Sequence, residues 1–220
     1  TTHHKPDVGK TFPKETPPES DEFNTSTLGP QWQWQANPRA MWSFMNVAQR
    51  SLRLYSQPIP DSTRSLWNVP NVLMQKFPAE EFTAMAKVSF APNSKIEGEQ
   101  AGRVIMGESY ATLGLKSTRT GIQIVYSVCK DAADGNTPKE ALSDALNGNS
   151  IYLRVTVRKG AICNFSYSTD GKKFVKAGDE FTAVPGKWIG AKVGLFCTRS
   201  LPTNDSGYLD VDWFRIEPVK

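Results

Sequence analysis

The stretch Phe82-Thr83-Ala84-Met85-Ala86-Lys87-Val88-Ser89-Phe90 decides the fold class of this 220-residue chain. Apolar side chains recur at every second position from Phe82 to Phe90, so they share one face of an extended segment. Residues 151–158 repeat the pattern, with apolar side chains alternating with polar and charged ones. Both stretches are typical of strands that bury one face and leave the other in solvent.

Weaker strand patterns and turn signals fill most of the remaining chain. The Asp170-Gly171 pair predicts a hairpin turn, and the capping box Thr137-Pro138-Lys139-Glu140 predicts a short helix that ends near Gly148. We therefore expect an all-β fold, a two-sheet antiparallel β-sandwich with one short helix in a loop. The further segments with strand patterns are residues 32–35, 51–55, 72–77, 102–107, 111–116, 121–128, 161–168, 172–176, 189–196 and 208–216.

The composition changes near residue 20. Residues 1–20 hold four prolines and few large apolar side chains, which is typical of an extended interdomain linker or arm. Residues 21–220 form the predicted sandwich domain. The first residues of the sequence do not show the charged–apolar–small-residue pattern of a leader, so we expect a mature form, a fragment or a cytoplasmic protein.

Charge and rare residues exclude several function classes. The 26 basic and 22 acidic residues give a net charge of +4, but the basic ones are scattered, so we expect no nucleic-acid partner. No apolar run is long enough to span a membrane. The two histidines lie within residues 1–5, which leaves none in the folded body for a catalytic triad or a histidine metal site.

The three cysteines are far apart in the sequence and form no Cys-x-x-Cys motif. Cys129, Cys163 and Cys197 allow at most one disulfide, and the favoured interpretation is three small buried thiols. We expect no required cofactor.

Three tryptophans carry the sequence-based candidates for ligand contact. Trp32 and Trp34 are two residues apart and would share one face of a strand, either as a sugar-stacking platform or, as we favour, within the core. Trp67 lies in a loop rich in Pro, Ser and Asp (residues 58–70), and loop aromatics often contact ligands or other domains.

The last strand carries a carboxylate between aromatic residues. Simple alternation places Asp212 on the face of Phe214 and Trp213 on the opposite face. Asp21, in the first strand, is expected to lie close by, and two carboxylates brought together could hold a structural calcium ion. The alternative is a hydrogen-bonded Asp212 without metal.

A set of short motifs resembles the C-terminal domain of family 43 glycoside hydrolases of the β-xylosidase and α-L-arabinofuranosidase type. The resemblance extends over about residues 6–217, and its motifs are specific only in combination. They are Ser20-Asp21-Glu22-Phe23-Asn24, Leu28-Gly29, Gln31-Trp32-Gln33-Trp34, Asn37-Pro38, Leu66-Trp67-Asn68-Val69-Pro70-Asn71, Gln75-Lys76-Phe77, Gly98-Glu99-Gln100-Ala101-Gly102, Phe165-Ser166-Tyr167-Ser168, Asp170-Gly171, Gly186-Lys187-Trp188, Gly194-Leu195-Phe196 and Asp212-Trp213-Phe214.

This resemblance implies a concanavalin-like β-sandwich that accompanies a catalytic five-bladed propeller. The expected function is that of an accessory domain that stabilises the propeller and helps shape its sugar pocket. None of the family's catalytic residues can be placed on this chain, so we expect the chain alone to be inactive. The candidates for ligand or interdomain contact are Trp67, Arg64 and Arg199.

A second function remains open from the sequence. The chain could be an autonomous carbohydrate-binding module that captures xylan or arabinoxylan by aromatic stacking. In either case the expected partners are a family 43 propeller and plant cell-wall oligosaccharides.

Overall fold

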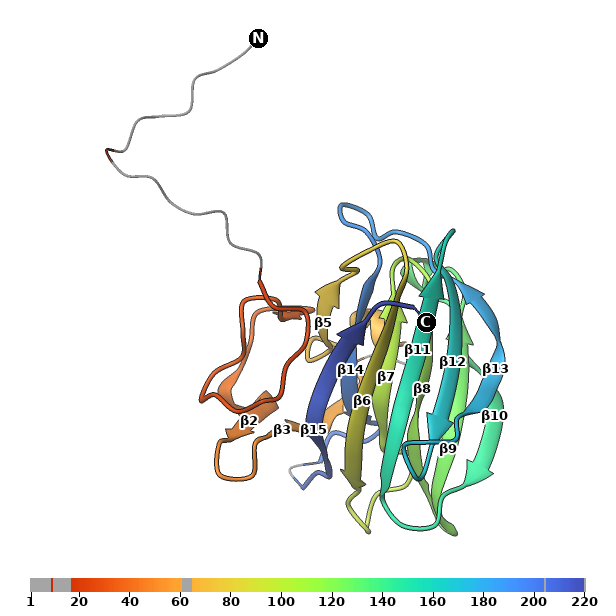
Figure 1. The fold of residues 1–220 in the computed structure, drawn as a ribbon. Coiled ribbons are helices and arrows are strands. Elements are labelled where there is room, and N and C mark those ends of the chain that lie inside the picture. The colour runs from red at the N-terminus through yellow and green to blue at the C-terminus, as the bar shows by residue number, and fades with distance from the viewer. Residues whose placement is uncertain (1–8, 10–16, 61–64, 204, 220) are drawn as a thin grey trace.

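A computed structural model describes residues 9, 17–60, 65–203 and 205–219 of the chain. Within these residues the strands form one sheet of eight and one of seven, packed face to face (Figure 1). Neighbouring strands are antiparallel except for the short parallel pair of β4 and β14. The predicted all-β sandwich is therefore confirmed.

The seven-stranded sheet contains the segment from which the fold class was predicted. The alternating apolar residues of β6, from Phe82 to Phe90, are at most 1% exposed and face the other sheet. In spatial order the strands are β13 (Val175–Thr182), β12 (Ile162–Ser168), β11 (Ser150–Arg158), β6 (Phe82–Ala91), β15 (Tyr208–Glu217), β3 (Ser51–Tyr55) and β2 (Ser43–Asn46).

The eight-stranded sheet is buried on both faces over part of its area. Its inner face packs against the other sheet, and residues 65–72 cover part of its outer face with Leu66, Val69 and Val72. Its strands are β1 (Gln33–Trp34), β5 (Leu73–Lys76), β14 (Lys192–Arg199), β7 (Gln100–Met106), β8 (Tyr110–Thr118), β9 (Gly121–Cys129), β10 (Lys139–Ala145) and, beside β14, β4 (Gln57–Pro58).

Besides the core between the two sheets, the outer face of the eight-stranded sheet carries a second cluster of buried apolar side chains, which we call the outer-face cluster. It joins residues 65–72 to the outward side chains of the sheet, among them Val104, Met106, Tyr110 and Phe196. Burial of both faces explains why residues 104–106 are continuously apolar instead of alternating.

The predicted helix at residues 137–148 is wrong. Residues Lys139–Ala145 form strand β10, which pairs with β9 and carries a bulge between Glu140 and Leu142. The capping box is a local signal worth about 1 kcal/mol, whereas the edge of β9 offers a row of backbone donors and acceptors that a strand satisfies. Described helical structure is limited to single 3-10 turns, none of which could cross a membrane.

Two other local expectations are refined. The Asp170-Gly171 hairpin forms, but its connection runs from Ser168 to Val175 because Asp170 Oδ1 accepts the N–H groups of Lys172 and Lys173. The three cysteines are buried and free, which confirms the interpretation as thiols.

Trp32 and Trp34 belong to the core, as the favoured interpretation had it. Trp32 is 8% exposed and packs edge-on to Phe214, with ring centroids 5.0 Å apart. Trp34 packs against the same core and meets Trp42 at 5.4 Å.

Arg103 is a charged residue on the inner face of β7. Its side chain is fully buried, its guanidinium carbon lies 4.8 Å from the ring centre of Phe214, and its nitrogens make no hydrogen bond within the described chain. Burial lowers its pKa to about 9, so the side chain remains protonated at neutral pH. An unpaired charge in such a place destabilises the folded state.

We predict that Arg103→Leu stabilises the protein by about 2 kcal/mol, because an apolar side chain fills the site without a desolvation penalty. For a domain of this size the melting temperature should rise by roughly 4–8 °C. Arg154→Leu is the control, since that guanidinium is partly exposed and donates to Ser166 Oγ; it should give no gain. A lower melting temperature for Arg103→Leu would contradict the prediction.

Candidate functional site

The outer face of the eight-stranded sheet carries two hollows on either side of the outer-face cluster. One lies at the end of the sheet where β14 begins, between Trp67 and Trp188. The other is a polar groove over β7–β10.

The Trp67–Trp188 pocket has a volume of about 250 Å³. Trp67 is partly buried in a 3-10 turn (Leu66–Asn68), and its backbone N–H donates to Ser65 Oγ at 3.2 Å. Gln35 connects the pocket walls, because its Nε2 donates to Trp67 O at 3.4 Å and its Oε1 accepts from Lys192 Nζ at 3.1 Å. Burial lowers the pKa of Lys192. These bonds fix the backbone of Trp67 at the pocket wall, and its side chain packs against the outer-face cluster.

Trp188 forms the opposite wall and projects into solvent. Its side chain is 95% exposed and the adjacent Ile189 is 39% exposed. The connection that carries them is anchored at both ends, because Pro185 O accepts from Glu108 N and Ala191 O accepts from Phe77 N.

Sequence reasoning did not single out Trp188. Residues 189–196 have a strand pattern, which placed Trp188 beside a predicted strand, whereas β14 begins only at Lys192. The signal that could have found it is the Pro185-Gly186 pair directly upstream, which marks a surface connection.

The chain enters the sandwich at this same end. Gln75 Nε2 donates to Glu19 O at 2.9 Å, and Ile216 N donates to Ser20 Oγ at 2.9 Å. Gln75 belongs to β5, whose last residue, Lys76, pairs with Lys192 at the start of β14. Figure 1 shows residues 17–20 on the side where β15 finishes and β14 starts. Of the predicted arm, residues 1–20, only residue 9 and residues 17–20 are described, so the arm stays a prediction.

Arg199 lies at the other end of β14, and the structure does not bring it to Trp67. Its guanidinium is buried and donates to the backbone carbonyls of Ser56, Leu201 and Thr203. Burial lowers its pKa. These contacts fix the connection between β14 and β15. Arg64, the remaining sequence candidate, lies outside the described residues.

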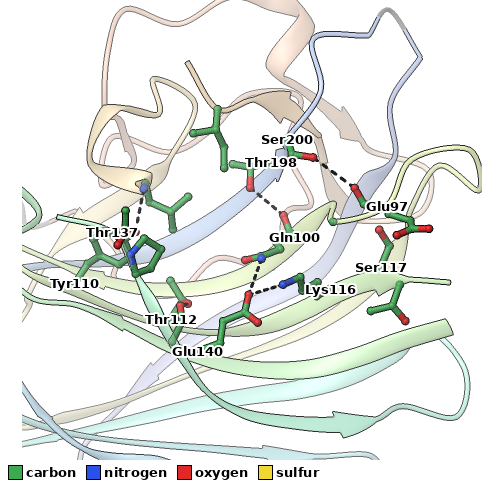
Figure 2. Close-up of a pocket in the computed structure, with 16 residues that line it drawn as sticks. Glu97, Gln100, Tyr110, Thr112, Lys116, Ser117, Thr137, Glu140, Thr198 and Ser200 are labelled. Carbon is green, nitrogen blue, oxygen red and sulfur yellow. Dashed lines mark hydrogen bonds and ion pairs between the residues drawn. The ribbon is translucent and has the colours of Figure 1, made fainter. Parts of the chain in front are cut away.

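The polar groove is larger, at about 570 Å³ (Figure 2). Glu140 Oε1 accepts from Lys116 Nζ at 2.5 Å and from Gln100 Nε2 at 3.2 Å. Deeper in the groove, the hydroxyls of Thr112 and Ser127 are 2.8 Å apart. Hydroxyl, amide and charged groups thus line one continuous surface.

The two carboxylates of the predicted calcium site each have protein partners. Asp21 accepts from Trp32 Nε1 at 2.8 Å, Phe23 N at 2.8 Å and Gln31 Nε2 at 3.3 Å. Asp212 accepts from Lys87 Nζ at 2.6 Å, and this hydrogen bond raises the pKa of Lys87. The described residues contain no group of three or more His, Cys, Asp or Glu that could hold a metal ion.

A bulge changes the faces expected for the last strand. The register of β15 shifts between Val211 and Trp213, so Val211 and Phe214 both face the core while Trp213 is only partly buried. Simple alternation had placed Val211 and Phe214 on opposite faces. The bulged residue is Asp212 itself.

Residues 20–217 match the family described as the β-xylosidase C-terminal concanavalin A-like domain. The chain is 28% identical over 230 residues to a β-xylosidase of Formosa agariphila, covering 97% of this chain and 37% of that protein. It is 26% identical over 209 residues to the non-reducing end α-L-arabinofuranosidase BoGH43B of Bacteroides ovatus, covering 90% and 36% respectively. The chain therefore spans just over a third of the length of these curated relatives.

Solved structures show the same fold. The GH43 protein BlXynB of Bacillus licheniformis superposes with a TM-score of 0.75 at 22% identity, covering 97% of this chain and 41% of that one. At this identity the likeness concerns the fold.

We predict that Asp21→Ala destabilises the protein by about 2 kcal/mol, because the mostly buried Trp32 indole loses its acceptor. Asp212→Ala should cost less than about 1 kcal/mol, since its ion pair with Lys87 is partly solvent-exposed. Urea unfolding measures both. Equal losses would contradict these roles.

The calcium site stays a prediction of the sequence, and thermal unfolding tests it. A bound ion would raise the melting temperature in calcium relative to EDTA by mass action, and Asp212→Asn would remove that rise. Identical melting temperatures of the wild type in calcium and in EDTA would contradict the calcium prediction.

Proposed function

The chain belongs to the family of β-xylosidase C-terminal concanavalin A-like domains, and from this premise we propose that it docks on a family 43 catalytic propeller and closes one side of its sugar pocket. The relatives are a β-xylosidase and an α-L-arabinofuranosidase. The proposed substrates are accordingly xylan-derived or arabinose-substituted saccharides of plant cell walls.

The observation that carries the proposal is the exposure of Trp188. A tryptophan that is 95% exposed leaves a large apolar ring in water, and tryptophan is enriched among the residues that dominate protein–protein binding energy. Ile189 extends the apolar surface, while Lys187 provides a polar edge. This composition fits a protein interface with an apolar centre and a polar rim.

The position of the chain's entry supports the same conclusion. Glu19 is held by Gln75 of β5, which neighbours the pocket strand β14, and Ser20 is held by Ile216 near the end of β15. A domain attached before these residues is tethered at the Trp67–Trp188 end, so docking there is favoured by a high effective concentration.

The pocket chemistry supports a wall of a sugar site. Trp67 and Trp188 line the pocket together with Gln35 and Lys192, so apolar rings and polar groups are both available to a pyranose or furanose ring. Among the described residues that line the pocket, none is Asp or Glu. Glycoside hydrolysis needs a pair of carboxyl groups flanking the scissile bond, so in this proposal the acid and base come from the propeller.

We predict that the coding region upstream of Thr1 specifies a five-bladed propeller with the catalytic carboxylates. Without the propeller, the 220-residue chain should release no nitrophenol from aryl xylosides or arabinofuranosides. Hydrolysis by the purified chain, in a preparation free of host glycosidases, or an upstream region that encodes no propeller would contradict the proposal.

We also predict that Trp188→Ala weakens binding of the separately produced propeller by roughly 30-fold, which is the loss of about 2 kcal/mol expected at an interface hot spot. Isothermal titration calorimetry measures the affinity. Trp213→Ala is the matched control, because Trp213 lies on the seven-stranded sheet beside Tyr152 and Arg215. Equal losses in the two variants would contradict docking at this end.

A further inference from the structure

The polar groove is separate from the docking end. Its lining comes largely from outward side chains of β7–β10, together with neighbouring loop residues and Thr198 and Ser200, on the other side of the outer-face cluster from Trp188. Its volume of about 570 Å³ falls within the range of about 300–1,000 Å³ typical of small-molecule sites. The docking role proposed above makes no use of it.

The groove can recognise a ligand only through its side chains. The backbone N–H and C=O groups of its floor are already paired in the ladders of β7 with β8, β8 with β9 and β9 with β10. A peptide added as a further strand is therefore not accommodated on this face. The available groups are hydroxyls, one amide and a few charged groups.

At the centre of the groove, donors and acceptors remain available side by side. Both contacts made by Glu140 use Oε1, and Oε2 accepts no hydrogen bond in the part of the chain that the structure describes. Lys116 Nζ uses one of its three N–H groups on Glu140. Figure 2 shows Gln100, Lys116 and Glu140 meeting at one point. Adjacent hydroxyls of a sugar, each both donor and acceptor, match this pattern.

The charged groups of the groove leave no surplus of positive charge. Lys116 pairs with Glu140 at 2.5 Å, and Glu97 pairs at 2.5 Å with Arg119, which lies outside the groove lining. An anionic ligand such as a nucleic acid or an acidic polysaccharide would need a surplus of positive charge, which these pairs do not leave. The groove thus favours an uncharged polar ligand.

The groove wall also has an apolar part. Ile59, Leu66 and Pro138 line it beside the polar groups. A sugar ring has the same division, with C–H groups on its faces and hydroxyls at its edge, and each part finds a complementary surface here.

We propose that this groove is a saccharide-binding site that takes an uncharged oligosaccharide chain through Gln100, Lys116 and Glu140. The identification of this oligosaccharide as a piece of xylan backbone rests on the proposed function. This site is distinct from one in which Trp67 stacks on a sugar ring. It would hold polysaccharide in the groove while the Trp67–Trp188 end of the sheet docks on the propeller.

The test is an NMR titration of the ¹⁵N-labelled 220-residue chain with xylohexaose, with maltohexaose and oligogalacturonate as comparison ligands. We expect saturable shifts of the amides of Gln100, Lys116 and Glu140 with xylohexaose and weaker ones with the acidic ligand. Lys116→Ala and Glu140→Ala should each weaken binding about tenfold, which corresponds to about 1.4 kcal/mol.

Glu22→Ala is the control, because it removes an exposed ion pair with Arg215 that lies away from the groove. The affinity of this variant for xylohexaose should match that of the wild type. The amide spectrum verifies that each variant is folded. Absence of saturable shifts, shifts confined to Trp67 and Trp188, or unchanged affinity in both groove variants would overturn the proposal. Equal binding of maltohexaose would retain the saccharide site but remove its xylan assignment. The titration mixture contains no propeller, so its result does not depend on whether the proposed docking is correct.

Discussion

The bridge between Asp21 and Phe214 is the contact on which the arrangement of the molecule depends. The backbone N–H of each residue donates to the carbonyl of the other, at 2.7 and 2.8 Å, and the Asp21 carboxylate accepts from the indole of Trp32. These bonds fasten the N-terminal segment to the final strand. They therefore determine at which end of the sandwich a preceding domain would sit, and that end carries Trp188.

The sequence predicted the interior of the fold well and its irregular parts poorly. Alternation identified β6 and β11 because each buries one face along its length. It failed at residues 139–145, where pairing with the edge of β9 overrides a local capping signal, and at Asp212, where a bulge reverses the faces. Such effects depend on partners distant in the sequence, which a periodic pattern does not contain.

The candidate site shows the same limit. Trp67 stands out in the sequence because it is an aromatic residue in an irregular loop, whereas Trp188 directly precedes a predicted strand and drew no attention as a contact residue. Lys116 and Glu140 are 24 residues apart, and their meeting requires the β8–β9–β10 order. The outer-face cluster then divides one sheet face into an aromatic end and a polar groove, so that two recognition surfaces of different chemistry share a single sheet.

Docking at the Trp67–Trp188 end is tested most directly by following the indole N–H signals of the six tryptophans in an NMR titration of the chain with the proposed propeller. We expect the signals of Trp188 and Trp67 to shift on complex formation, while those of the core residue Trp32 and of Trp213 on the seven-stranded sheet stay in place. A complex that forms with shifts at Trp213 and none at Trp188 would contradict docking at the Trp67–Trp188 end.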